Sequence, residues 1–107
     1  MVELRVGVLP EAALAAAARF HVEVLPEAVA SLTESPSHLT LIFPPADHSH
    51  HSWRLAAIQS LAREFAPVRV NALVGDSDKA IGAALAYLQT AAGVTGQLLE
   101  LDDTGAG

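Results

Sequence analysis

The sequence predicts a small α/β domain with about four parallel strands and with helices mainly on one face of the sheet. Two observations lead to this fold class. First, short segments alternate apolar and polar residues as strands do, and longer segments carry apolar residues at helical spacing. Second, these segments follow one another in the order strand, helix, strand, helix, strand, helix, strand. Such an alternation is typical of parallel strands joined by right-handed helical crossovers.

Four segments have the pattern of strands. In residues 2–8 the apolar side chains of Val2, Leu4, Val6 and Val8 alternate with other residues. The second strand is expected at residues 38–43 and stops at Pro44-Pro45, because proline has no N–H to donate within a sheet. Residues 68–74 and 97–101 are expected to form the third and fourth strands.

Helices are expected between these strands. An alanine-rich segment covers residues 11–19, and a second helix is expected to run to about residue 32 with a break near Pro26, although the alternation in residues 20–25 also fits a strand. We expect Ser52 to cap a third helix and Ser77 to cap a fourth, and Gly93 to end the fourth. The third helix carries an apolar stripe, and so does the fourth: Leu55, Ile58, Leu61, Ala62 and Phe65; Ile81, Leu85, Leu88 and Ala92.

The strand patterns suggest that the two sheet faces differ. One set of side chains is apolar throughout and is expected to lie under all the helices, and it includes Leu99 and Leu101 of the last strand. The opposite set is mixed and expected to be wetter, although Leu9, Ile42, Leu73 and Leu98 are placed there. A homodimer would shield these four residues, or the face is solvated with scattered apolar side chains.

Composition limits the classes of function. The chain of 107 residues fits a single domain, expected at residues 1–103 with a flexible tail at 104–107. Twelve acidic and six basic residues give a net charge of −6, which disfavours nucleic acids and anionic membranes as partners. Cysteine is absent, so disulfides and thiolate chemistry are excluded. With neither a signal peptide nor an apolar run of membrane-spanning length, we expect a cytoplasmic protein.

Two segments resemble the short-chain dehydrogenase/reductase family. Residues 60–72 read SLAREFAPVRVNA, similar to the family's helix leading into its sixth strand, and residues 94–102 read VTGQLLELD, similar to its last turn and strand. Residues 38–43 are similar to the family's fifth strand, and residues 20–32 more loosely to the helix before it. The resemblance, which covers residues 36–102 well, implies a truncated Rossmann-like half-domain, the C-terminal half of a doubly wound fold.

The resemblance also shows which chemistry is missing. The family binds its dinucleotide with Gly-x-x-x-Gly-x-Gly after a strand, and none of the seven glycines here forms that loop. Where the family has Tyr-x-x-x-Lys, an ungapped alignment places Asp47 and His51, and Pro44-Pro45 stand where its catalytic serine follows the fifth strand. Since Asp47 has no phenol and His51 is a weaker cation than lysine, we expect no catalytic residue and no bound cofactor.

The densest polar cluster is Asp47, His48, His50 and His51. Carboxylate and imidazole ligands suit zinc, nickel or copper, so these four residues are the candidate metal ligands, with His38 joining if the loop folds back. The alternative is a solvated loop that caps a helix, with any metal adventitious. Asp47 and His51 also have the spacing of an acid–base pair, although no nucleophile stands beside them.

Other polar and aromatic residues have structural interpretations. Asp76 and Asp78 are expected to cap a helix rather than bind a ligand. Arg69 and Asn71 are placed on the barer face, where they meet a symmetry mate or water. Trp53 is expected to anchor the core unless it is exposed at an interface, and Tyr87 to lie among core residues.

These observations predict a non-catalytic module that homodimerises or docks onto another protein. The alternative is a small-molecule or nucleotide binder, or a residual NAD(P)-dependent oxidoreductase. Its ligand crevice would lie at the carboxyl ends of the strands, where residues 44–51 and 75–77 form the rim.

Overall fold

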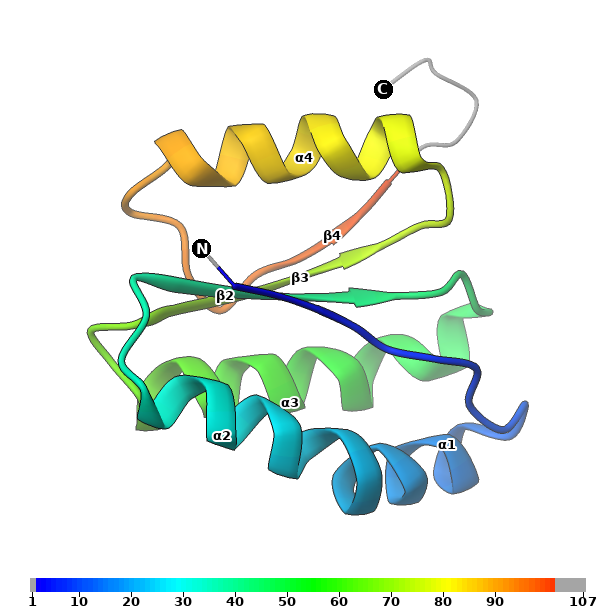
Figure 1. The fold of residues 1–107 in the computed structure, drawn as a ribbon. Coiled ribbons are helices and arrows are strands. Elements are labelled where there is room, and N and C mark those ends of the chain that lie inside the picture. The colour runs from blue at the N-terminus through cyan, green and yellow to red at the C-terminus, as the bar shows by residue number, and fades with distance from the viewer. Residues whose placement is uncertain (1, 102–107) are drawn as a thin grey trace.

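A computed structural model describes residues 2–101 as one four-stranded parallel sheet between layers of helices (Figure 1). The strand order is β1-β2-β3-β4, so each crossover adds the next strand on the same side. The strands are β1 (Val2–Arg5), β2 (His38–Phe43), β3 (Arg69–Val74) and β4 (Leu98–Glu100). The predicted α/β class and parallel sheet are confirmed, and the tail at 104–107 lies outside the described residues.

The helices are α1 (Ala13–Arg19), the π-helical turn η1 (Phe20–Val24), α2 (Leu25–Thr33), the 3₁₀ turn η2 (His48–His50), α3 (His51–Glu64) and α4 (Asp78–Thr90). The predicted break near Pro26 is a change of helix type and not a gap: the π-helical turn ends at Val24, and α2 begins at Leu25 with Pro26 in its first turn. The π-helical turn accommodates Pro26, which has no backbone N–H. The last N–H before the proline, that of Leu25, donates to the Phe20 carbonyl five residues back.

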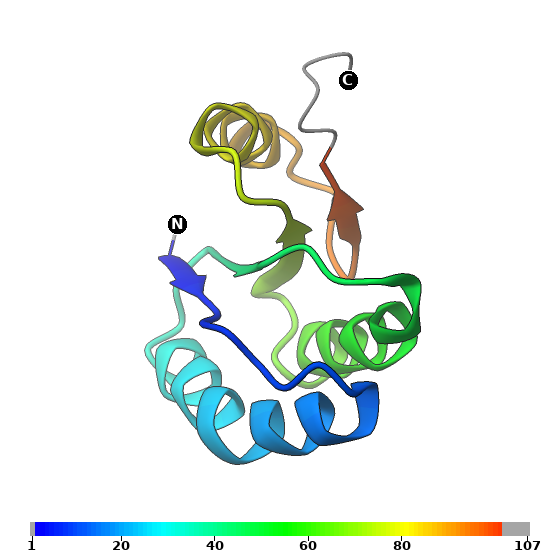
Figure 2. The same cartoon turned by 90° about the vertical axis from the view of Figure 1, so that its right-hand side faces the viewer.

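One helix lies on the face that we expected to be bare. Helices α1, α2 and α3 cover one face of the sheet, and α4 covers the other (Figures 1 and 2). Since all strands are added in one direction, crossovers on opposite faces have opposite hands. The crossovers through α2 and α3 have the usual right hand, so the one through α4 has the rare left hand. Helices therefore lie mainly, but not all, on one face.

The register of β4 corrects a second expectation. Ala72 pairs with Leu98 and Leu73 with Leu99, so Leu98 points to the face of α1–α3 and Leu99 to the face of α4. The assumed phase of this short strand was off by one residue, which exchanges its two faces. As a result Glu100 lies on the same face as α3, where it comes near His51.

Two apolar clusters hold the layers together. The larger one joins α1–α3 to the sheet around fully buried residues such as Phe20, Phe43 and Ile58. The smaller one places Ile42 and Leu73 under Ile81 and Leu88 of α4. Of the four residues that a homodimer was expected to shield, Ile42 and Leu73 are buried within the chain, and Leu9 and Leu98 are half-buried against the larger cluster. Within residues 2–101, no helix has the length and apolarity needed to cross a bilayer.

Candidate functional site

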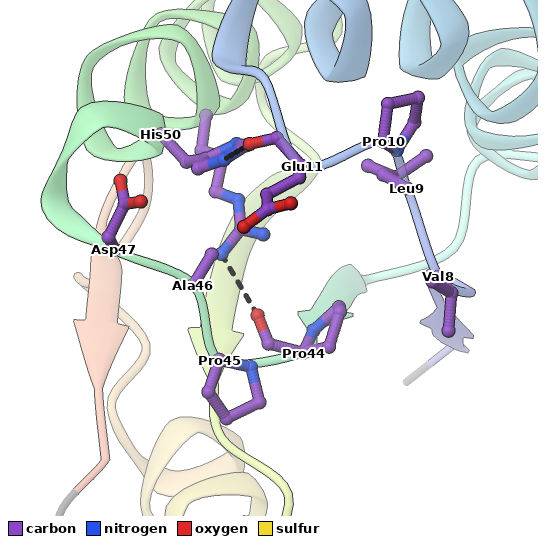
Figure 3. Close-up of a pocket in the computed structure, with 10 residues that line it drawn as sticks. Val8, Leu9, Pro10, Glu11, Pro44, Pro45, Ala46, Asp47 and His50 are labelled. Carbon is purple, nitrogen blue, oxygen red and sulfur yellow. Dashed lines mark hydrogen bonds between the residues drawn. The ribbon is translucent and has the colours of Figure 1, made fainter.

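A cleft of about 430 Å³ opens beyond the carboxyl ends of β1 and β2 (Figure 3). Its walls come from two loops and from the first turns that lead into α3. The loop after β1 supplies residues 8–11, and the loop after β2 supplies residues 44–47, followed by His50 and Arg54. Ligands of open α/β sheets bind at this edge, so the cleft is the candidate site, on part of the rim that the sequence predicts.

The loop after β2 is shaped by Pro44-Pro45 and by Asp47. The two prolines end the strand, and Asp47 Oδ1 accepts a hydrogen bond from the Ser49 N–H at 2.9 Å and another from the Ser49 hydroxyl. These bonds lower the pKa of the Asp47 carboxyl, with smaller help from His50 and His48. The predicted cap Ser52 is wrong: Asp47 caps the turn His48–His50, which places Ser52 inside α3.

Arg54 is the unexpected member of the site. It is only 4% exposed, and its Nη1 donates to the Pro44 carbonyl at 3.1 Å. The guanidinium carbon lies 4.6 Å from the ring centre of Phe43 and 5.7 Å from that of Trp53. Its Nε has no hydrogen-bond partner, and Arg54 takes part in none of the ion pairs of residues 2–101. Burial lowers the pKa of Arg54, against a smaller opposing effect of Glu100.

The sequence contains a signal for this burial. Arg54 stands four residues before Ile58, so it belongs to the apolar stripe that faces the core. A cation on such a stripe is unusual, because charged side chains are rarely buried without a partner. The stripe identified in the sequence starts at Leu55, one residue too late, which is why Arg54 was missed.

His50 links the two loops of the cleft. Its Nε2 lies 2.9 Å from the Glu11 carbonyl, and its Nδ1 accepts from the Trp53 indole N–H at 3.2 Å. Trp53 also packs against Phe20 and Phe43, in agreement with its expected role as a core anchor. Both ring nitrogens of His50 are therefore engaged within the domain.

The other candidate metal ligands point to different neighbours. Asp47 bonds to Ser49, and His51 Nδ1 lies 3.6 Å from Glu100 Oε1, so these two residues do not pair with each other as an acid and a base. In the part of the chain that the structure describes, no three His, Asp or Glu side chains converge as ligands. Binding of a metal through His50 would require one ring nitrogen to give up its hydrogen bond, either Nδ1 the bond from Trp53 or Nε2 the bond to Glu11. Metal binding by Asp47, His48, His50 and His51 stays a prediction.

His38 cannot join that cluster. It starts β2, and the cluster comes after the end of β2, so a strand of about 17 Å separates them. His38 belongs instead to a buried group at the amino edge of the sheet, where Asn71 Nδ2 donates to His38 Nε2 at 3.1 Å and the Thr40 hydroxyl lies 3.1 Å from the same nitrogen. Burial, followed by the charge of Arg69, lowers the pKa of His38 to about 4.

Arg69 and Asn71 both bond to groups within the domain, whereas the sequence left contact with water or with a symmetry mate as the two alternatives. Asn71 is fully buried, donates to the Val94 carbonyl and accepts from the Gln97 N–H. Arg69 Nη1 donates to carbonyls at the end of α4, at 3.1 Å to Leu88 and 2.8 Å to Ala91. Both side chains hold the connection between α4 and β4, which the left-handed crossover places over this end of the sheet.

The remaining candidates have structural places. The Ser77 hydroxyl caps α4 by accepting from the Ala80 N–H, as predicted, and Asp78 lies in the first turn of α4, 3.7 Å from Arg5. Tyr87 does not lie among core residues: it is 55% exposed on the outer side of α4. The only tyrosine of the chain therefore stands away from the cleft.

The comparisons with known proteins give one match. A family model described as "Short chain dehydrogenase-like protein" matches residues 4–101, nearly the whole described chain. The search of curated proteins and the search of solved structures found no match. The family assignment thus rests on a model that spans the sheet, the cleft and every helix.

Proposed function

Because the chain belongs to the short chain dehydrogenase-like family, we propose that it is a non-catalytic version of that fold, which works by docking to a second copy of itself or to another protein. One observation carries this proposal: the scaffold is complete from β1 to β4, while the family's reactive positions are used for local structure. Asp47, at the expected tyrosine position, caps a turn, and His51, at the lysine position, faces Glu100.

The outer side of the α1–η1 helix is the surface that supports docking. Leu14 is 86% exposed and Val22 is 74% exposed, and their spacing of eight residues, with Ala18 between them, aligns them along one side of the helix. Large apolar side chains aligned on a helix surface are typical of contacts with another chain. We define Leu14, Ala18 and Val22 as the outer stripe.

A shallow groove runs beside the stripe. It has a volume of about 360 Å³ and lies between the η1–α2 helix and α3. Its floor includes apolar side chains, among them Leu25, Val29, Trp53 and Ala56. A second copy related by a two-fold axis would place its own stripe against this region, since such interfaces use the same patch on both subunits.

Sedimentation velocity from low micromolar to near-millimolar concentration tests the proposal. We expect the wild type to associate and Leu14→Glu and Val22→Glu to remain monomeric, because each places a charge on the stripe. Ala83→Glu, at an exposed position of α4, is the matched control and should associate like the wild type. The net charge of −6 opposes self-association, so added salt should strengthen it. A wild type that stays monomeric throughout and copurifies with no partner contradicts the proposal.

Two further parts of the proposal concern cofactor and location. We propose that the domain binds no nicotinamide cofactor, because no glycine loop for a pyrophosphate occurs in these 107 residues. A saturable rise in melting temperature with NAD, NADP or adenine nucleotides contradicts this. We place the domain in the cytoplasm on the absence of cysteine, which cell fractionation tests.

A further inference from the structure

The cleft contains a buried charge that the domain itself leaves unbalanced. Moving a guanidinium out of water is costly unless a carboxylate or several acceptors replace the lost hydration. Within residues 2–101 the guanidinium of Arg54 donates to the Pro44 carbonyl, and no carboxylate lies within ion-pair distance of it there. A guanidinium has five N–H donors, so most of its capacity is unused.

The position of Arg54 is fixed in a way that suits a ligand. Its guanidinium lies over the Phe43 ring and near the Trp53 ring, and its bond to the Pro44 carbonyl ties it to the end of β2. A planar cation held by two rings and a carbonyl loses little further freedom when an anion pairs with it. Because Arg54 is also part of the cleft lining, an anion in the cleft can reach it.

The walls of the cleft restrict the kind of anion. Most of the lining is apolar: Val8, Leu9, Pro10, Pro44, Pro45 and Ala46. The two acidic residues of the lining are Glu11 and Asp47 (Figure 3). Two carboxylates oppose a multiply charged phosphate, whereas a single charge paired with Arg54 leaves an apolar body to lie against the prolines.

We propose that this cleft binds a small organic acid with one carboxylate and a compact apolar body, and that its carboxylate pairs with Arg54. This ligand site is separate from the outer stripe, so it does not depend on the docking proposal. The carboxylate of the bound acid is the counterion that Arg54 lacks. It can accept up to two parallel N–H···O bonds from the guanidinium, the geometry that arginine forms with carboxylates.

The single tryptophan of the chain reports on the site. The guanidinium carbon of Arg54 lies 5.7 Å from the ring centre of Trp53, and Trp53 bonds to His50, which lines the same cleft. A ligand in the cleft should therefore change the fluorescence of Trp53. We would titrate the full chain with hexanoate, and with three matched compounds: hexanamide lacks the charge, acetate lacks the apolar body, and inorganic phosphate carries the higher charge. We expect a saturable change with hexanoate, and a weaker one or none with the others.

Variants separate binding by Arg54 from its effect on structure. Arg54→Met should weaken hexanoate binding by at least about tenfold, because charge-assisted hydrogen bonds are lost. Arg63→Met, an exposed arginine of the same helix, should bind as the wild type does. If Arg54→Met does not fold by circular dichroism, Arg54→Lys takes its place; it keeps the charge, loses the fork and should still bind several-fold more weakly.

Three results would overturn the proposal. They are the absence of a saturable response to hexanoate, an equal response to hexanamide or phosphate, and unchanged affinity in the folded Arg54 variant. Sedimentation of Arg54→Met should match the wild type, so failure of this site and failure of the docking proposal remain distinguishable.

Discussion

The buried polar side chains at the two edges of the sheet differ in how fully they are hydrogen-bonded within the domain. At the amino edge, Arg69 and Asn71 bond to the carbonyls and N–H groups that connect α4 to β4, and among the fully buried side-chain nitrogens and oxygens of this group only His38 Nδ1 lacks a partner. At the carboxyl edge, Arg54 is buried with one accepting carbonyl and an open cleft beside it. The first arrangement stabilises the fold, and the second leaves hydrogen-bonding capacity for something outside the chain.

The largest effect is expected at the amino edge. Asn71→Leu keeps the approximate volume but leaves His38 Nε2, the Gln97 N–H and the Val94 carbonyl without the amide. We expect a loss of about 3 kcal/mol in the free energy of unfolding, because several buried groups lose partners at once. Urea unfolding measures this, with exposed Gln89→Leu as the control. A loss below about 1 kcal/mol would show that this amide network is not what holds the edge together.

The second prediction uses pH at the same edge. His38 has a pKa of about 4 in the fold against 6.5 for the free side chain, so below pH 6.5 the unfolded chain binds the extra proton. The stability from the neutral ring is therefore complete above pH 6.5 and is lost as the pH falls toward 4, by about 3 kcal/mol.

His38→Gln isolates this contribution from the titration of the carboxylates. We expect the difference in unfolding free energy between wild type and His38→Gln to shrink between pH 7 and pH 4. The difference for exposed Gln89→Leu, which removes no titratable group, should stay constant. A constant difference for His38→Gln would mean that His38 is not held neutral by burial.

A smaller loss is expected for Arg69→Met. The variant removes charge-assisted hydrogen bonds to the last carbonyls of α4, which also carry the negative end of the helix dipole. We expect about 2 kcal/mol of destabilisation by urea unfolding. The loss should leave hexanoate binding unchanged, because Arg69 stands at the opposite edge from the cleft. Stability within about 0.5 kcal/mol of the wild type would contradict a structural role for this arginine.

Periodicity in the sequence predicted the local elements of the fold, whereas features decided by distant contacts were missed. Strand β2 and the cap Ser77 were predicted at their observed places, because apolar alternation and a hydroxyl before a helix are local signals. The face covered by α4 was missed, because the hand of a crossover leaves no mark in the local pattern. The phase of β4 was missed because three residues are too few to define one.

The sequence predicted at which edge of the sheet the candidate site lies, but it did not identify Arg54. The rim at residues 44–51 was expected from the general rule for open sheets, and the structure places the cleft there. Arg54 carried a signal, its position on the buried stripe, but the contacts that isolate it come from Phe43 and Pro44 on another element. A sequence pattern cannot show that a buried charge has no counterion.

The stability of Arg54→Met tests most directly whether the two edges differ in this way. Because the variant replaces an unbalanced buried cation by an apolar side chain of similar length, we predict a free energy of unfolding equal to that of the wild type or higher by about 1 kcal/mol. A loss of about 2 kcal/mol or more, like that expected for Arg69→Met, would show that Arg54 stabilises the fold. It would contradict the claim that Arg54 is an unbalanced charge available to a ligand.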